Sequence, residues 1–125
     1  MNKHEKKILI IEDEDALRSI LADALRHSGF VVIEAKDGHA GIMSAESAHP
    51  DLILLDILMP RMDGRAVFKA FRENEKTRAI PVLFLTNLST VESISGALDG
   101  EKADYIIKSD WSIDEIIARV KKKLA

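Results

Sequence analysis

The chain of 125 residues contains no cysteine, which excludes a disulfide framework and a zinc site built from thiolates. It also lacks a long hydrophobic run. The apolar stretch after the basic start MNKHEKK is too short for a secretion signal or a membrane span. The net charge is −3, and lysine and arginine are scattered apart from KKK near the end, so the basic stripe of nucleic-acid binders is missing. These absences predict a cytoplasmic protein that binds neither membrane nor nucleic acid through this domain.

The apolar fraction of 46% and the charged fraction of 31% are ordinary for one globular domain, here residues 1–125. Short β-branched runs alternate along the chain with longer segments of helical period, a pattern typical of βαβ units. The expected strands are residues 8–11, 31–35, 52–55, 82–85 and 105–107.

Five helices are expected between and after these strands. The second covers residues 38–48 and the third about 65–74, while the fourth and fifth begin at Ser89 and Ser112, each with a glutamate three residues later in capping-box spacing. Gly29 closes the first helix. The apolar face expected for that first helix consists of Ala16, Leu17, Ile20, Leu21, Ala24 and Leu25.

The first, third and fourth strands are almost uniformly apolar, as expected where helices cover both faces of a parallel sheet. The predicted fold is therefore a doubly wound α/β domain with five parallel strands. In such sheets, ligands bind beyond the carboxyl ends of the strands. The residues at those ends are Glu12 and Asp13, Asp56, Thr86 and Lys108.

Residues 8–15 read ILIIEDED, and four consecutive acids repel one another unless something positive faces them. Asp15 is expected to accept backbone N–H groups at the start of the first helix, and Glu14 to face solvent. Taken alone, the run could equally be a solvated loop with a helix cap. Because Asp56 should lie at the same edge, the acids favour a site for a hard divalent cation, with Mg²⁺ the natural candidate.

Four motifs occur in order at the strand ends: Glu12-Asp13, LLDILMPRMDG over residues 54–64, Thr86 after VLFL, and DYIIK ending at Lys108. With these motifs the chain resembles the receiver domains of response regulators over essentially its whole length. The resemblance implies the flavodoxin-like strand order 2-1-3-4-5. It also implies phosphoryl transfer to Asp56 from the phosphohistidine of a histidine kinase or phosphotransfer protein.

The same resemblance implies a role for each site residue. Glu12, Asp13 and Asp56 would hold Mg²⁺ together with the backbone carbonyl of Leu58. Such a domain is not an enzyme beyond its own phosphorylation and dephosphorylation.

In the family, an ammonium and a hydroxyl stabilise the phosphoryl oxygens, and these correspond to Lys108 and Thr86. Thr86 and Tyr105 would then act as the switch that remodels the face of the fourth helix, fifth strand and fifth helix. A downstream protein target would bind that face, and a phosphorylation-dependent dimer is possible.

Other functions fit the residues less well. A haloacid-dehalogenase-type phosphatase needs a second acid two residues after its nucleophile, where this chain has Leu58. A flavodoxin-like FMN binder needs a Ser/Thr/Gly-rich loop after the first strand, where this chain has acids. The alternative that stays open is a receiver-like interaction module that works without phosphorylation.

Overall fold

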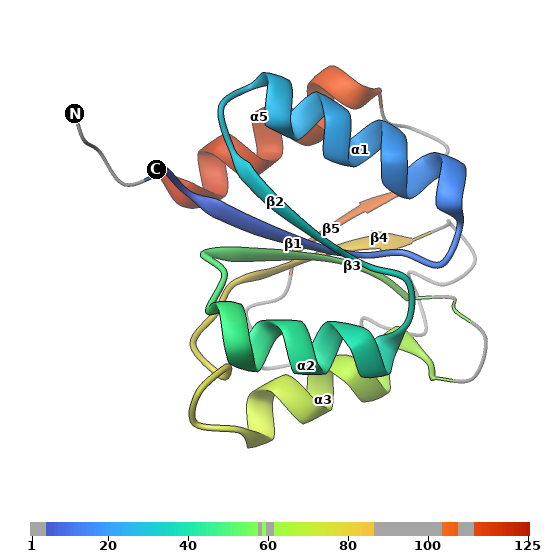
Figure 1. The fold of residues 1–125 in the computed structure, drawn as a ribbon, viewed down its shortest axis with the longest axis vertical. Helices are drawn as coiled ribbons and strands as arrows, with labels where there is room; N and C mark the ends of the chain where they lie inside the picture. The colour runs from blue at the N-terminus through green and yellow to red at the C-terminus, as the bar shows by residue number, and fades with distance from the viewer. Residues whose placement is uncertain (1–4, 58, 60–61, 87–103, 108–111) are drawn as a thin grey trace.

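The computed structural model describes residues 5–57, 59, 62–86, 104–107 and 112–125 (Figure 1). The described strands are β1 (Lys7–Ile11), β2 (Val31–Ala35), β3 (Leu52–Asp56), β4 (Val82–Thr86) and β5 (Asp104–Ile107). The described helices are α1 (Asp15–His27), α2 (Gly38–Ala48), α3 (Gly64–Glu73) and α5 (Ile113–Leu124). The helix predicted to begin at Ser89 lies outside the described residues.

All five strands are parallel and form one sheet in the order β2-β1-β3-β4-β5, which confirms the predicted topology. The order reverses between β1 and β3, so the carboxyl ends of these two strands are neighbours. Their register pairs Ile11 with Leu55, and on the other side of β3 Asp56 pairs with Leu85. The residues that follow β1 therefore emerge at the level of Asp56.

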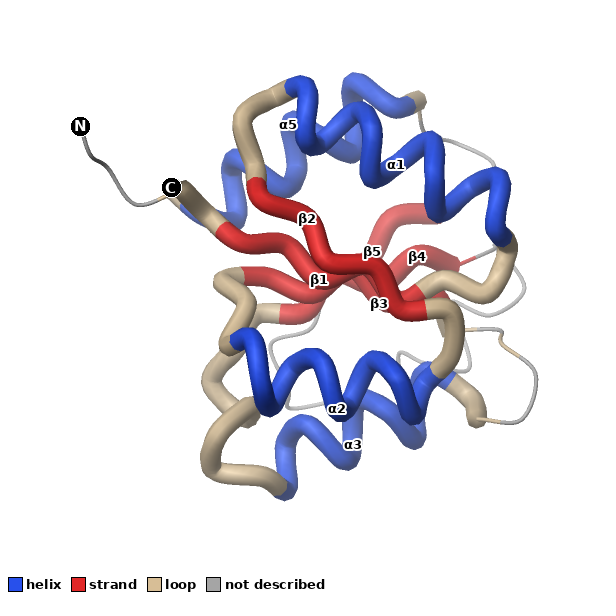
Figure 2. The backbone as a smooth tube through the Cα atoms, viewed as in Figure 1, coloured by secondary structure: helices blue, strands red, loops and turns tan. Residues whose placement is uncertain are grey.

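Helices cover both faces of the sheet (Figure 2): α1 and α5 lie on one face, α2 and α3 on the other. Alternate residues of each strand supply the two apolar layers. In β1, Ile8 and Ile10 pack with α1 and α5, whereas Leu9 and Ile11 pack with α2 and α3. Burial on both faces explains why the strands read as continuous apolar runs rather than as an alternating pattern.

Capping residues begin and end the helices, and at Ser112 and Gly29 they do so as the sequence predicts. Asp37 accepts a hydrogen bond from the backbone N–H of Ala40 at 2.8 Å, and Ser112 accepts one from Glu115 at 3.2 Å. Gly29 has a φ of +98°, which glycine adopts without a Cβ penalty. Its N–H donates to the carbonyl of Arg26, and the next N–H donates to Leu25, so α1 ends in a Schellman motif.

The apolar face expected for the first helix is wrong at two of its residues. Ile20 is 52% exposed and Ala16 is also exposed, whereas Leu21, Ala22 and Leu25 are the buried residues of α1. The buried face of α1 is therefore rotated about the helix axis relative to the expected face, and both faces are compatible with a 3.6-residue period.

The N-cap is Glu14, which is exposed as predicted but makes no capping bond with its side chain. Asp15 is already inside the helix, where its carboxylate bonds Arg18 one turn later at 2.6 Å. Asp15 therefore does not cap the helix as expected.

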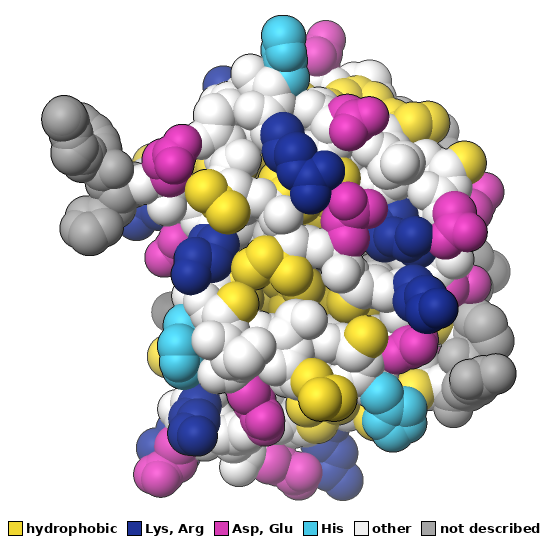
Figure 3. Space-filling model, in the orientation of Figure 1, with side chains coloured by type: hydrophobic (Ala, Val, Ile, Leu, Met, Phe, Trp, Pro, Cys, Tyr) yellow, Lys and Arg dark blue, Asp and Glu magenta, His cyan; other side chains and the backbone are white. Residues whose placement is uncertain are grey.

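On the face of the molecule drawn in Figure 3, basic and acidic side chains are intermixed rather than separated by sign. No stripe of one charge crosses that face. Among the described residues, no helix is long and apolar enough to cross a membrane.

Candidate functional site

Three acids gather at the neighbouring ends of β1 and β3. Glu12 and Asp13 follow β1, Asp56 ends β3, and one carboxylate oxygen from each lies within 4.8 Å of the others. Glu12 and Asp56 are only 1% and 2% exposed, and Asp13 is half-buried. Within the described part of the chain, this is the group of acids and histidines with metal-ligand spacing. The structure thus brings together the three carboxylates that the sequence placed at one edge.

Backbone hydrogen bonds continue past both strand ends and fix the main chain beneath these acids. The N–H of Glu12 donates to the carbonyl of Ala35 in β2 at 3.0 Å, and the N–H of Ile57 donates to Leu85 in β4 at 3.2 Å. The carboxylate of Glu12 also accepts the N–H of Glu14 at 3.1 Å, which closes the turn into α1. The backbone that carries the acids is therefore held by hydrogen bonds to the neighbouring strands of the sheet.

Gly64 packs directly against the end of β3. Its N–H donates to the carbonyl of Ile57 at 2.8 Å. A Cβ atom at position 64 would lie 2.5 Å from the carbonyl oxygen of Asp56 and 2.6 Å from the Cα of Ile57. Since the obstructing atoms are backbone, only glycine allows α3 to begin so close to Asp56.

Asp63 caps α3 just before this glycine. Its carboxylate accepts the backbone N–H of Arg65 at 2.7 Å and also bonds the guanidinium of Arg65 at 2.9 and 3.0 Å. These interactions, led by the side-chain hydrogen bond, lower the pKa of Asp63 and raise that of Arg65. Asp63 is therefore ionised over a wide pH range and keeps the start of α3 in place.

The remaining predicted site residues are described in part. Thr86 ends β4, which neighbours β3, and its backbone pairs with Ile107 in β5. The backbone of Tyr105 lies in β5 opposite Phe84. Leu58 and Lys108 lie outside the described residues.

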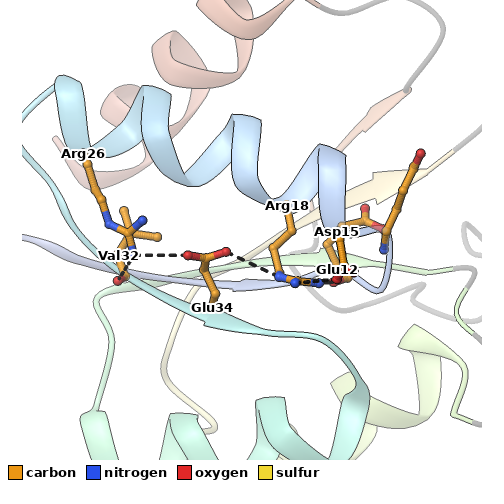
Figure 4. Close-up of polar contacts among 7 residues, drawn as sticks. Glu12, Asp15, Arg18, Arg26, Val32 and Glu34 are labelled. Atoms are coloured by element: carbon orange, nitrogen blue, oxygen red, sulfur yellow. Dashed lines mark hydrogen bonds and ion pairs between the residues drawn. The ribbon is translucent and has the colours of Figure 1, made fainter.

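Sequence reasoning overlooked Arg18, whose side chain reaches from α1 back to the loop that carries the acids (Figure 4). Its guanidinium donates to the backbone carbonyl of Glu12 at 2.9 Å. The sequence contains one readable signal, the i, i+3 spacing of Asp15 and Arg18, but the contact with Glu12 depends on the turn between β1 and α1.

The donor set suits Mg²⁺. This ion binds oxygen at 2.0–2.1 Å, so two oxygens bound directly to it lie at most about 4.2 Å apart, and it usually keeps several waters. Carboxylates already gathered within 4.8 Å need only small side-chain adjustments to reach that spacing. The chain contains no cysteine and so no thiolate ligand, which again favours a hard cation.

A parallel α/β sheet with buried acids at the carboxyl ends of β1 and β3 defines a receiver-type domain. The family model described as the response regulator receiver domain matches residues 8–121, and the chain belongs to this family. Proteins of this family act in phosphorylation-dependent two-component signalling. The predicted family is thereby confirmed.

Known relatives agree with this assignment. The chain is 36% identical over 118 residues to the DNA-binding dual master transcriptional regulator RpaA of Synechocystis sp., covering 94% of this chain and 48% of that protein. It is 37% identical over 116 residues to the alkaline phosphatase synthesis transcriptional regulatory protein PhoP of Bacillus subtilis, covering 93% and 47%. The chain thus spans about half the length of these relatives.

Solved structures show the same fold. The signal receiver domain of a signal transduction histidine kinase from Syntrophus aciditrophicus matches with a TM-score of 0.84 at 30% identity, covering 95% of this chain and 89% of that one. The receiver domain of the Francisella response regulator 1452 matches with a TM-score of 0.82 at 27% identity, covering 94% and 95%.

Proposed function

We propose that residues 1–125 form one receiver domain in which Asp56 accepts a phosphoryl group from the phosphohistidine of a histidine kinase or phosphotransfer protein. A carboxylate oxygen of Asp56 attacks phosphorus, the P–N bond breaks, and its electron pair returns to the imidazole nitrogen of the donor. The product is an aspartyl phosphate. The modified side chain then alters a surface that another protein recognises.

The observation that carries this proposal is the gathering of Glu12, Asp13 and Asp56 at the switch point of the sheet. Asp56 is the acid on the central strand, which suits it to be the acceptor, while the pair after β1 suits metal binding. In the proposal, Glu12, Asp13, Asp56 and the backbone carbonyl of Leu58 hold Mg²⁺. When bound, the ion offsets the negative charges that attack on a phosphoryl group brings together.

Lys108 and Thr86 complete the proposed site as donors to the phosphoryl oxygens. The end of β4 places the backbone of Thr86 one strand away from Asp56. Thr86 and Tyr105 would transmit the change to the face that includes β5 and α5, where a downstream protein target binds and a phosphorylation-dependent dimer can form. The charge of the new group, roughly −1.5 to −2 by analogy with phosphorylated hydroxyl residues, provides the driving force.

The proposal is tested by incubating the protein with acetyl phosphate and Mg²⁺, and separately with a phosphorylated histidine-kinase domain. Intact mass spectrometry should show one added phosphoryl group in the parent. The group should be lost on treatment with hydroxylamine, which cleaves acyl phosphates. Asp56→Asn should show no adduct. Asp23→Asn, which removes an exposed acid from the middle of α1, should react like the parent.

Two results would refute the proposal. One is an adduct of equal yield in Asp56→Asn, which would move the modification elsewhere. The other is a folded parent that takes up no phosphoryl group from either donor, which would favour a receiver-like module that works by protein contact alone.

A further inference from the structure

Arg18 bonds three separate parts of the chain, and none of these bonds goes to the carboxylates of the acid cluster. One terminal nitrogen of the guanidinium donates to the backbone carbonyl of Glu12 at 2.9 Å, and the other bonds the carboxylate of Asp15 at 2.6 Å. Its Nε lies 3.4 Å from the carboxylate of Glu34 in β2. The side chain of Arg18 is only 15% exposed, and its contacts with Glu12 and Glu34 are partly buried, whereas Asp15 is exposed.

The geometry points to Arg18 as a positioning residue that holds the Glu12-Asp13 turn ready for Mg²⁺, an inference that rests on the proposed function. The turn joins the end of β1 to the start of α1, and Figure 4 shows the guanidinium of Arg18 between α1 and β2 beside it. A planar guanidinium with five donors can hold three acceptors in fixed directions. Arg18 thereby ties the main chain of Glu12 to the neighbouring strand and to the helix.

The effect is one of position rather than of charge. A second α1 residue, Arg26, approaches the other carboxylate oxygen of Glu34 at 3.3 Å. The two guanidinium groups are thus balanced by the carboxylates of Asp15 and Glu34. By charge alone, removing a cation beside the acids should tighten binding of Mg²⁺. Loss of positioning should weaken it, so the sign of the change separates the two explanations.

The test compares Arg18→Gln with the control Arg26→Gln. Arg26 also lies on α1 and also bonds Glu34, but it donates in addition to the backbone carbonyl of Val32, away from the acids. Mg²⁺ affinity is measured by chemical-shift titration of the backbone amides. The phosphorylation rate with acetyl phosphate is then measured against Mg²⁺ concentration, and thermal unfolding is followed for each variant.

Arg18→Gln should raise the dissociation constant for Mg²⁺ about tenfold, the lower end of the 10- to 100-fold range for groups that orient metal ligands. The phosphorylation rate should approach that of the parent at saturating Mg²⁺. Arg18→Lys should fall between the two, because a single ammonium cannot span the three acceptors. Arg26→Gln should bind Mg²⁺ like the parent.

An unchanged or lower dissociation constant in Arg18→Gln would overturn the inference, even if the unfolding temperature fell. If Arg18→Gln does not fold, Arg18→Lys and Glu34→Gln decide by the same criterion, each with a smaller expected rise. A parent that binds Mg²⁺ but is not phosphorylated at Asp56 would refute the proposed function alone, and the affinities would still decide the role of Arg18.

Discussion

Replacing Gly64 by alanine should destabilise the protein and disturb Asp56 at the same time. The added Cβ would meet the carbonyl oxygen of Asp56 at 2.5 Å and the Cα of Ile57 at 2.6 Å, and neither backbone atom can move without shifting the end of β3. Overpacking of this kind costs about 1–3 kcal/mol. Alanine regains at most about 1 kcal/mol through its helix propensity, and less at the first position of a helix.

Gly38 provides a matched control because it also begins a helix directly after an aspartate cap. A Cβ there would meet side-chain rather than backbone atoms, the Cγ2 of Val67 at 2.7 Å and the Sδ of Met62 at 2.9 Å, of which the flexible Met62 can move aside while the buried Val67 is stiffer. Gly38→Ala should therefore cost less than Gly64→Ala and leave phosphoryl uptake at Asp56 unchanged.

Urea unfolding gives the free energy of unfolding for both variants, and thermal unfolding should show a shift of about 4 °C per kcal/mol for a domain of this size. The rate of phosphorylation by acetyl phosphate reports on Asp56. The reasoning is wrong if Gly64→Ala is no less stable than Gly38→Ala, or if it is phosphorylated at the parental rate despite a clear loss of stability.

The remaining predictions concern α1 and the cap of α3. Leu21→Ala should lower the free energy of unfolding by about 2–5 kcal/mol in a urea titration, whereas the exposed Ile20→Ala should change it by less than about 0.5 kcal/mol; equal losses would contradict the assigned burial. The pKa of Asp63 is lower in the folded than in the unfolded chain, so its contribution to stability is present above the ordinary carboxyl pKa and is lost as pH falls through the lowered value. In Arg65→Met, the free energy of unfolding should fall less steeply as the pH is lowered. An unchanged dependence on pH would show that Arg65 does not cause the shift in the pKa of Asp63.

The strands and helix boundaries were predictable because their signals are local. Apolar runs bounded by turn residues marked β1 to β4 to within a residue or two, and α2 was predicted with its observed bounds. The acid cluster was equally predictable, since parallel strands must end at one edge and the register of β1 on β3 aligns their ends.

The rotation of α1 was not predictable from its own sequence. Leu17 and Leu21 fit both the expected stripe and the observed one, and only the neighbouring sheet decides whether Ile20 or Ala22 is buried. The same holds for Arg18, because its contact with Glu34 crosses from α1 to β2 and joins residues far apart in the chain. Pairings of this kind leave no trace in local periodicity.

The position of β3 at the centre of the sheet has a mechanical consequence. Hydrogen bonds hold it to β1 on one side and β4 on the other, every one of its residues is buried, and Gly64 closes its end. If Asp56 accepts a phosphoryl group as proposed, we expect β3 to stay in place. The structural change should then occur in the side chains and loops beyond the edge of the sheet.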